Sequence, residues 1–385
     1  MFCDMMPDSL KRIAVILEGR VQYERNVLRG IREFAALKEN WLLRLEMPGS
    51  RTAARIENWK PDGVLFQSSG LTRAAVEKVS RMKNSIHLSE PPAGAIWNSV
   101  GLDNAEIGRT AAAYFFERRL QHFAFVGSKG IGFSKTRKAS FQTAAKGAGG
   151  SVQVVEFGEK IVESEIIKWL RNLPKPCGLF ATHDECSLML TTMCRGEGIR
   201  VPEEIAILGV DNDTLICELA LPQLSSVSVP SKRVGFAAAE MLAQKLKRKS
   251  PGKRSVLLPP TGVVTRQSTD VFQTEDDVVN RALRFMHGNV NRRINVEDVL
   301  REIGSSRRLL ERKFMHQLGR SPLQEIQHSR MELAKRLLIE TRQPLREIAI
   351  QCGCGDASRM VTMFRRECGM TPGEFRKVKT NSTIQ

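Results

Sequence analysis

Three charged side chains in the first 220 residues follow apolar runs that are typical of buried strands. Asp184 and Asp211 stand just after two such runs, and Arg137 lies near the start of an amphipathic stretch that follows a third. Planar charged groups bind a polyol well, because each can bridge neighbouring hydroxyls. These residues are therefore candidate ligand-binding residues, provided that the fold brings the strand ends together.

The chain around these residues alternates short apolar runs with amphipathic stretches, a rhythm that predicts parallel strands covered by helices. There are too many runs for one compact sheet, so we expect two doubly wound parallel sheets in two lobes. In such sheets ligands bind beyond the carboxyl ends of the strands. Strands are predicted at residues 13–17, 41–45, 63–66, 85–88, 122–126, 152–155, 178–181 and 205–210.

Length and periodicity together predict a further domain. A chain of 385 residues is long enough for two or three compact domains. Beyond residue 277 every periodic segment is helical, and a polar, acidic stretch precedes it. We therefore predict a two-lobed sensor over 1–268, a linker over 269–276 and an all-helical domain over 277–385.

The net charge of +17 is unevenly distributed along the chain. Residues 281–385 hold 21 Lys and Arg against 11 Asp and Glu, a net charge of +10 in 105 residues. A concentrated basic excess favours a polyanionic partner. The helical domain is therefore the part of the chain that we expect to bind nucleic acid.

Within the helical domain, two short helices each end in a glycine and are followed by a second helix. The first pair spans residues 296–318 and turns at Gly304, and the second spans 345–368 and turns at Gly353. This pattern is typical of the helix-turn-helix motif, whose second helix enters the major groove of DNA. Inward-facing apolar residues of the first motif leave a charged side exposed, which carries Arg307, Arg308, Glu311 and Arg312.

Residues 294–377 resemble the AraC-type DNA-binding domain. The resemblance includes the Ala-Lys-Arg-Leu-Leu run at 334–338 and the Phe-Arg-Arg run at 364–366. Cys354 stands where that family usually has an aromatic residue, and Arg359-Met360 stands where it usually has a pair of aromatic or His residues. The resemblance implies a transcription regulator that reads bases with Arg307, Arg308 and Glu311 in the first motif and with Asp356, Ala357 and Arg359 in the second.

The first 268 residues resemble the LacI/GalR-type, periplasmic-binding-protein-like sensors without the N-terminal helix-turn-helix of that family. The matching segments include Gly-Leu-Asp-Asn at 101–104 and the Ile-Leu-Gly-Val-Asp-Asn run at 207–212. Such a sensor joined to an AraC-type domain is similar to the XylR-like regulators of sugar operons. The resemblance implies that Arg137 bridges two sugar hydroxyls, that Asp184 and Asp211 accept from others, and that Tyr23 and Asp103 complete the site.

Several alternatives stay open at this point. Asp103 and Asp211 are also placed to cap helices, Trp97 could be either an aromatic face for the sugar or a core residue, and His183 is expected in a loop. A purine or a phosphorylated metabolite is the alternative effector. An enzyme or a scaffold is the weaker alternative, because the glycine-rich stretch 127–136 lacks the glycine that a phosphate-binding loop needs before its lysine.

The remaining expectations concern partners and compartment. The Cys and His residues fit no metal spacing, so we expect no cofactor, no metal, and reduced buried cysteines. No apolar run is long enough for a membrane helix, which favours a cytoplasmic protein. The expected partners are double-stranded DNA with repeated half-sites, a monosaccharide effector and a second copy of the chain, and a contact with RNA polymerase is compatible with this role.

Overall fold

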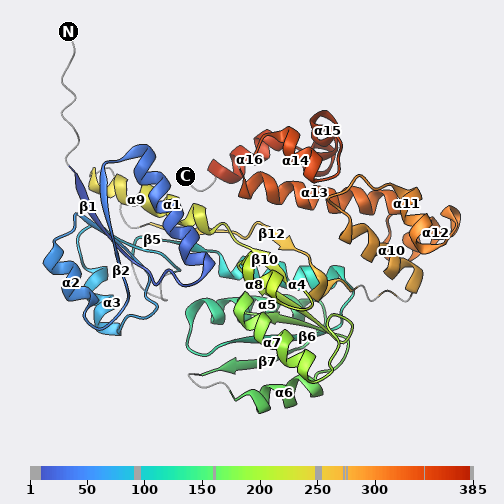
Figure 1. The fold of residues 1–385 in the computed structure, drawn as a ribbon, viewed down its shortest axis with the longest axis horizontal. Helices are drawn as coiled ribbons and strands as arrows, with labels where there is room; N and C mark the ends of the chain where they lie inside the picture. The colour runs from blue at the N-terminus through green and yellow to red at the C-terminus, as the bar shows by residue number, and fades with distance from the viewer. Residues whose placement is uncertain are drawn as a thin grey trace, which may run out of the picture. The chain divides into compact units, whose positions relative to one another are not determined.

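The computed structural model of the chain describes residues 10–90, 97–158, 162–247, 254–271, 274, 276–341 and 343–381. The chain divides into two compact units. One comprises Met1–Asp103 and Pro230–Pro259, and the other comprises Asn104–Val229 and Pro260–Gln385. Each unit contains one six-stranded sheet, and the second unit also contains the C-terminal helices (Figure 1).

The sheet of the first unit has the strand order β11-β5-β4-β3-β1-β2, and its neighbouring strands are parallel. Its central strands are apolar on both faces because helices cover both sides, as expected for a parallel sheet. The strands are β1 (Lys11–Ile16), β2 (Trp41–Glu46), β3 (Gly63–Phe66), β4 (Ser85–His87), β5 (Ser99–Leu102) and β11 (Ser255–Leu258). The helices are α1 (Gln22–Lys38), α2 (Thr52–Trp59), α3 (Arg73–Ser80) and α9 (Ser231–Leu246).

Two glycines allow α1 and α9 to pack in direct backbone contact. A Cβ atom on Gly30 would lie 1.9 Å from the carbonyl oxygen of Lys232, and one on Gly235 would lie 1.9 Å from that of Val27. No side chain fits at either position, because the obstacle is backbone in both cases. This contact fixes α9 in the first unit even though it is distant from α1 in sequence.

The sheet of the second unit has the order β12-β10-β9-β8-β6-β7. Its strands are β6 (His122–Ser128), β7 (Val152–Phe157), β8 (Cys177–Ala181), β9 (Ile205–Val210), β10 (Ser225–Ser228) and β12 (Gly262–Val264). Its α-helices are α4 (Asn104–Glu117), α5 (Gly132–Gly147), α6 (Glu163–Asn172), α7 (Asp184–Gly196) and α8 (Thr214–Leu219), and a 3₁₀ turn, η1, covers Gln267–Thr269.

The prediction of two doubly wound parallel sheets is confirmed, with one local difference. The edge strand β12 pairs antiparallel with β10, whereas the other neighbouring strands of this sheet are parallel. An antiparallel edge is common on otherwise parallel sheets. The predicted strands also leave out β5, β10, β11 and β12, which have only three or four residues each.

In the described part of the chain after residue 276, the secondary structure consists of helices joined by loops. They are α10 (Asp277–Gly288), α11 (Val296–Ile303), α12 (Arg307–Leu318), α13 (Pro322–Glu340), α14 (Leu345–Gln351), α15 (Ala357–Cys368) and α16 (Pro372–Asn381). One apolar cluster contains Leu310 and Phe314, and a second contains Met360 and Phe364. The two predicted motifs therefore have separate cores. Residues 272, 273 and 275 of the predicted linker lie outside the described residues.

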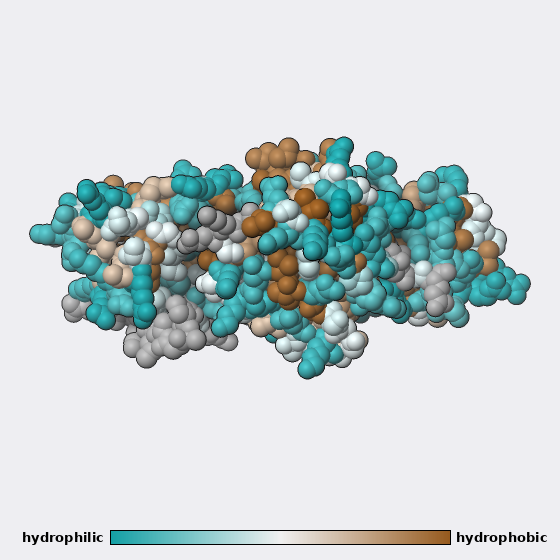
Figure 2. Space-filling model, turned by 90° about the horizontal axis from the view of Figure 1, so that it is seen from below, coloured by the Kyte–Doolittle hydropathy of each residue, from teal (hydrophilic) through white to brown (hydrophobic). Residues whose placement is uncertain are grey.

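The described cysteines are unpaired thiols, and all except Cys368 are buried. Burial raises the pKa of Cys177 and Cys194 to about 12, so these thiols are unreactive. Cys3 lies outside the described residues. Hydrophilic residues cover most of the face seen in Figure 2, where hydrophobic residues gather in a few groups. No helix of the described part of the chain is long and apolar enough to cross a membrane.

Candidate functional site

The carboxyl ends of three neighbouring strands in the second unit carry the first candidate site. Strands β9, β8 and β6 are adjacent in the sheet, so the segments that follow them leave at the same edge. Asp211 follows β9, His183 follows β8, and Arg137 lies in α5, which follows β6. Arg137 and His183 lie near enough to Asp211 that their positive charges lower the pKa of its carboxyl group.

Arg137 is a buried guanidinium that the surrounding chain holds in one orientation. Its side chain is 4% exposed, and its Nε donates to Oδ1 of Asn104 over 3.0 Å. Its Nη1 donates to the carbonyl oxygen of Thr182 over 2.5 Å, and the ring of Phe133 lies 4.9 Å from Cζ. Because these contacts fix the plane of the guanidinium, it is preorganised to donate to a ligand.

Asp211 begins a loop that the sheet holds in an unusual backbone conformation. Its φ is +103° and that of Asn212 is +52°, values that side chains other than glycine seldom adopt. The N–H of Asp211 donates to the carbonyl oxygen of Val227, and the N–H of Asn212 donates to Oγ of Ser226. Strain of this kind is concentrated at functional sites, where the surrounding structure maintains it.

The surroundings of Asp211 affect the pKa of its carboxyl group in opposite directions. Removal from water raises the pKa of its carboxyl group to about 6, while the charges of Arg137 and His183 lower it and those of Glu185 and Asp213 raise it. The carboxylate form is thus costly in the free protein. A ligand hydroxyl that donates to Asp211 would replace part of the lost hydration.

Asp184, by contrast, is engaged on both oxygens by its own unit. Its side chain is fully buried, Oδ1 accepts from Oγ of Ser226 over 2.6 Å, and Oδ2 accepts from the N–H of Asp213 over 2.7 Å. Burial raises the pKa of this carboxyl group well above its usual range. These contacts favour a structural role, in which Asp184 holds the loop after β9 against β10.

The helix caps near the site differ from the expected ones. Asp213 caps α8 by accepting from the N–H groups of Leu215 and Ile216, so Asp211 is not the cap. His183, expected in a loop, caps α7, since its Nδ1 accepts from the N–H of Cys186. The two remaining candidates, Tyr23 in α1 and Asp103 after β5, are half-buried residues of the first unit.

Trp97, also in the first unit, packs as a core residue. Its ring centroid lies 5.2 Å from that of His87 and 6.1 Å from that of Phe66. His87 is buried in the same aromatic group, and burial lowers its pKa to about 4. These contacts favour the core alternative for Trp97.

The second candidate site is the surface of the first helix-turn-helix motif. Gly304, with φ +64°, ends α11, and the side chain of Ser306 caps α12. Leu310 and Phe314 of α12 are buried, so Arg308 and Arg312 are left on the exposed side of the helix. The geometry is that of a recognition helix with its N-terminal turn in solvent.

Arg307 and Glu311 lie on the same surface but are paired with each other. The Nε of Arg307 lies 3.0 Å from Glu311, and its Nη1 lies 2.9 Å from Glu297 of α11. Exposed pairs of this type contribute little to stability. They can therefore open at small cost when either side chain meets a base edge.

Two of the three departures from the AraC-type pattern, Cys354 and Met360, are core residues of the second motif. Cys354 is 2% exposed and Met360 is 0% exposed, and both pack in the second apolar cluster. Arg359 is exposed, and Asp356 caps α15 through the N–H of Arg359. The two departures therefore change the packing beneath the recognition helix and leave its exposed side to Ala357 and its neighbours.

The loop before α11 joins the two motifs. A Cβ atom on Gly353, whose φ is +62°, would lie 2.3 Å from the carbonyl oxygen of Arg292 in this loop. Arg330 of α13 donates from Nη2 to the carbonyl oxygen of Ile294, also in the loop, over 2.7 Å. The turn of the second motif at Gly353 is thus in direct backbone contact with the loop that leads into the first motif.

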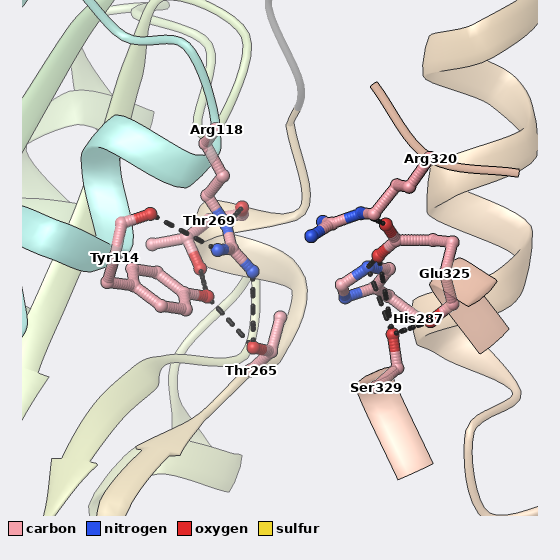
Figure 3. Close-up of polar contacts among 8 residues, drawn as sticks. All are labelled: Tyr114, Arg118, Thr265, Thr269, His287, Arg320, Glu325 and Ser329. Carbon is pink, nitrogen blue, oxygen red and sulfur yellow. Dashed lines mark hydrogen bonds and ion pairs between the residues drawn. The ribbon is translucent and has the colours of Figure 1, made fainter. Parts of the chain in front are cut away.

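A buried carboxylate fixes α10 to α13 within the helical region. Glu325 is 1% exposed, accepts from Nε of Arg320 over 2.5 Å and lies 2.9 Å from Nε2 of His287 (Figure 3). Although burial raises the pKa of Glu325, these partners lower it to about 2. Among the described residues, no group of His, Cys, Asp and Glu side chains could hold a metal ion.

Comparison with known proteins agrees with this architecture. Residues 112–269 match the periplasmic binding protein-like domain, and residues 299–378 match a helix-turn-helix domain. The Xylose operon regulatory protein of Escherichia coli is 27% identical, over 96% of this chain and 97% of that protein. The structure of the xylose-binding transcription activator xylR superimposes with a TM-score of 0.62 at 24% identity, over 97% of this chain and 99% of that one.

A LacI-type regulator from Alkaliphilus metalliredigens, complexed with D-xylulofuranose, superimposes with a TM-score of 0.56 at 16% identity, over 67% of this chain and 99% of that one. The two matched domains define a DNA-binding transcription regulator with a periplasmic-binding-protein-like sensor, and not an enzyme. Within that class, the chain is XylR-like, because its similarity to the Xylose operon regulatory protein extends over almost its full length.

Proposed function

We propose that the chain is a sugar-responsive regulator whose effector is D-xylose or a related monosaccharide. The observation that carries this proposal is that the charge of a buried, oriented guanidinium, Arg137, acts on the desolvated carboxyl group of the strained residue Asp211. Arg137 bridges two hydroxyls and Asp211 accepts from another, while Asp184 supports the loop. Tyr23 and Asp103 are the candidate effector-binding residues of the first unit.

Titration calorimetry of the full chain against pentoses and hexoses tests this assignment. D-xylose or a closely related sugar is expected to bind, whereas purines and phosphorylated metabolites should give no binding signal. A purine or phosphorylated metabolite that binds while every sugar stays silent would overturn the sugar assignment. It would leave the DNA-binding function untouched.

Sugar affinity is expected to fall as the pH decreases from 8 to 5. The pKa of Asp211 is about 6 in the free protein, so the carboxylate that accepts a hydroxyl is present above pH 6 and is lost below it. The dissociation constant should rise about tenfold between pH 8 and pH 5. Calorimetry across this range measures the change.

The matched variant for this pH profile is Asp211→Asn. Its amide cannot titrate, so its weaker affinity should be flat between pH 8 and pH 5. An equally steep profile in Asp211→Asn would show that another group causes the pH dependence.

We assign residues 1–268 to the sensor, 269–276 to the linker and 277–385 to the DNA-binding domain, in which the exposed arginines of α12 read bases. The variant Arg308→Ala should lose about 1–3 kcal/mol of binding free energy for a DNA sequence selected from a random pool, and its base preference should relax at one position. Anisotropy titration measures both effects. The exposed Arg171→Ala in the sensor is the control, and equal losses in the two variants would contradict a reading role for Arg308.

We further propose that the chain acts as a cytoplasmic homodimer on repeated half-sites, where it can contact RNA polymerase. Each chain carries two motifs, so a dimer presents four recognition helices. A footprint longer than about two helical turns is expected. A shorter footprint on selected DNA, together with a monomer mass by light scattering, would refute the dimer.

A further inference from the structure

Residues 265–269, the segment that leads from β12 toward α10, are bound closely to the second sheet. The Oγ of Ser268 donates to the carbonyl oxygen of Ile207 in β9 over 2.6 Å and accepts from the N–H of Ser225 in β10 over 2.9 Å. The hydroxyls of Thr269 and Ser225 lie 2.6 Å apart. These bonds tie Ser268 and Thr269 to the interior of β9 and to the first residue of β10.

The end of α4 holds the same segment from the other side. Arg118 donates from Nε to the carbonyl oxygen of Thr269 over 3.0 Å, and the hydroxyl of Tyr114 lies 2.6 Å from that of Thr269 and 2.9 Å from that of Thr265 (Figure 3). The first residue of α4 is Asn104, the partner of Arg137. One helix thus connects the effector site with this segment.

Arg266 is the residue of the segment that reaches the loop after β9. Its Nη2 donates to Oδ1 of Asn212 over 2.9 Å, and its Nη1 donates to the carbonyl oxygen of Leu224 over 2.9 Å. Its own N–H donates to Oγ of Ser225, which fixes its backbone to β10. The guanidinium is therefore held at its base and bridges two neighbouring loops.

Asn212 is well suited to receive this contact. Its φ is +52°, a conformation that Asn adopts more readily than most residues, and it directly follows the strained Asp211. Asp213, the next residue, is tied by its N–H to Asp184 and caps α8. The bond from Arg266 thus acts on the one residue between the proposed ligand carboxylate and a fixed helix cap.

We propose that Arg266 is a positioning residue for effector recognition, because by holding Asn212 it fixes the loop that presents Asp211. Through the same contact, effector binding at Asp211 affects the segment that leads to the DNA-binding helices. This inference rests on the proposed function of Asp211 as a ligand residue. It assigns a role in the sensor's response to a residue outside the effector site itself.

The first test needs no effector. Amide hydrogen exchange of the full-length protein is measured for residues 211–216 in the wild type, in Arg266→Met and in the control Arg171→Ala, whose partner Glu197 lies elsewhere in the unit. Arg266→Met should accelerate exchange in this loop by roughly tenfold, while the control leaves it unchanged. Unchanged exchange in Arg266→Met would overturn the proposal.

The second test separates positioning from general stability by a double-mutant cycle with D-xylose. Glycine at position 212 keeps the left-handed backbone but removes the amide that Arg266 holds. We expect Arg266→Met and Asn212→Gly each to weaken binding about tenfold, and the double variant to be no weaker than either single one. Additive losses would show that Arg266 acts through Leu224 instead, and would refute the proposal.

The link to the DNA-binding helices has its own measurement. In the wild type, D-xylose should change the exchange of residues 265–271, and Arg266→Met should lose this change even at saturating sugar. A change retained by the variant would overturn the link. If the wild type binds no sugar at all, the proposed effector fails, but exchange in the loop still decides whether Arg266 positions it.

Discussion

Replacing Arg137 by methionine is expected to reduce the affinity for D-xylose by at least about 100-fold. Each charge-assisted hydrogen bond to a ligand hydroxyl contributes roughly 1.5–3 kcal/mol, and a guanidinium that bridges two hydroxyls loses two of them. The variant also removes a positive charge that lowers the pKa of Asp211, so less of the accepting carboxylate remains at neutral pH. Calorimetry at pH 8 measures the loss where Asp211 is still largely ionised.

The matched variant is Arg137→Lys, which keeps the charge but lacks the planar fork. It should bind with intermediate affinity, because one ammonium group cannot reproduce the bonds to Asn104, Thr182 and two hydroxyls together. DNA binding without sugar should persist in both variants, which shows that the chain is folded. Wild-type sugar affinity in Arg137→Met would remove this residue from the effector site.

The fold was largely predictable because alternation and helical periodicity are local signals. Runs such as 205–210 and glycine turns such as Gly304 mark strands and helix ends wherever they occur. The AraC-type and LacI-type resemblances extended these signals over almost the whole chain. Strand β12 escaped because its pairing with β10 depends on residues distant in sequence.

The site was less predictable, because equivalent sequence positions have different surroundings. Asp184 and Asp211 both follow buried strands, but Ser226, 42 residues after Asp184, occupies one oxygen of Asp184. Cys354 and Met360 stand next to DNA-reading positions, yet helix packing turns both into the core. The contact that Arg266 makes could not be predicted from local sequence, since its partner Asn212 lies 54 residues earlier.

The contact at Gly353 gives the second large expected effect. In Gly353→Ala the left-handed backbone costs about 1–2 kcal/mol, and the new Cβ would lie 2.3 Å from the carbonyl oxygen of Arg292 and 3.1 Å from that of Val290. Both obstacles are backbone atoms in the loop whose Ile294 carbonyl Arg330 holds. The total destabilisation of the second motif should exceed about 3 kcal/mol, with loss of high-affinity DNA binding.

Gly304→Ala provides a control that separates the two costs. Its φ of +64° nearly equals the +62° of Gly353, but a Cβ there would meet no atom within 4 Å. It should therefore lose only the conformational cost of about 1–2 kcal/mol in the first motif. Amide exchange of residues 296–318 and 345–368, with DNA titration of both variants, measures the difference. Equal destabilisation would show that close packing on Arg292 contributes nothing. A larger loss in Gly353→Ala would show that this contact stabilises the second motif against the loop before α11.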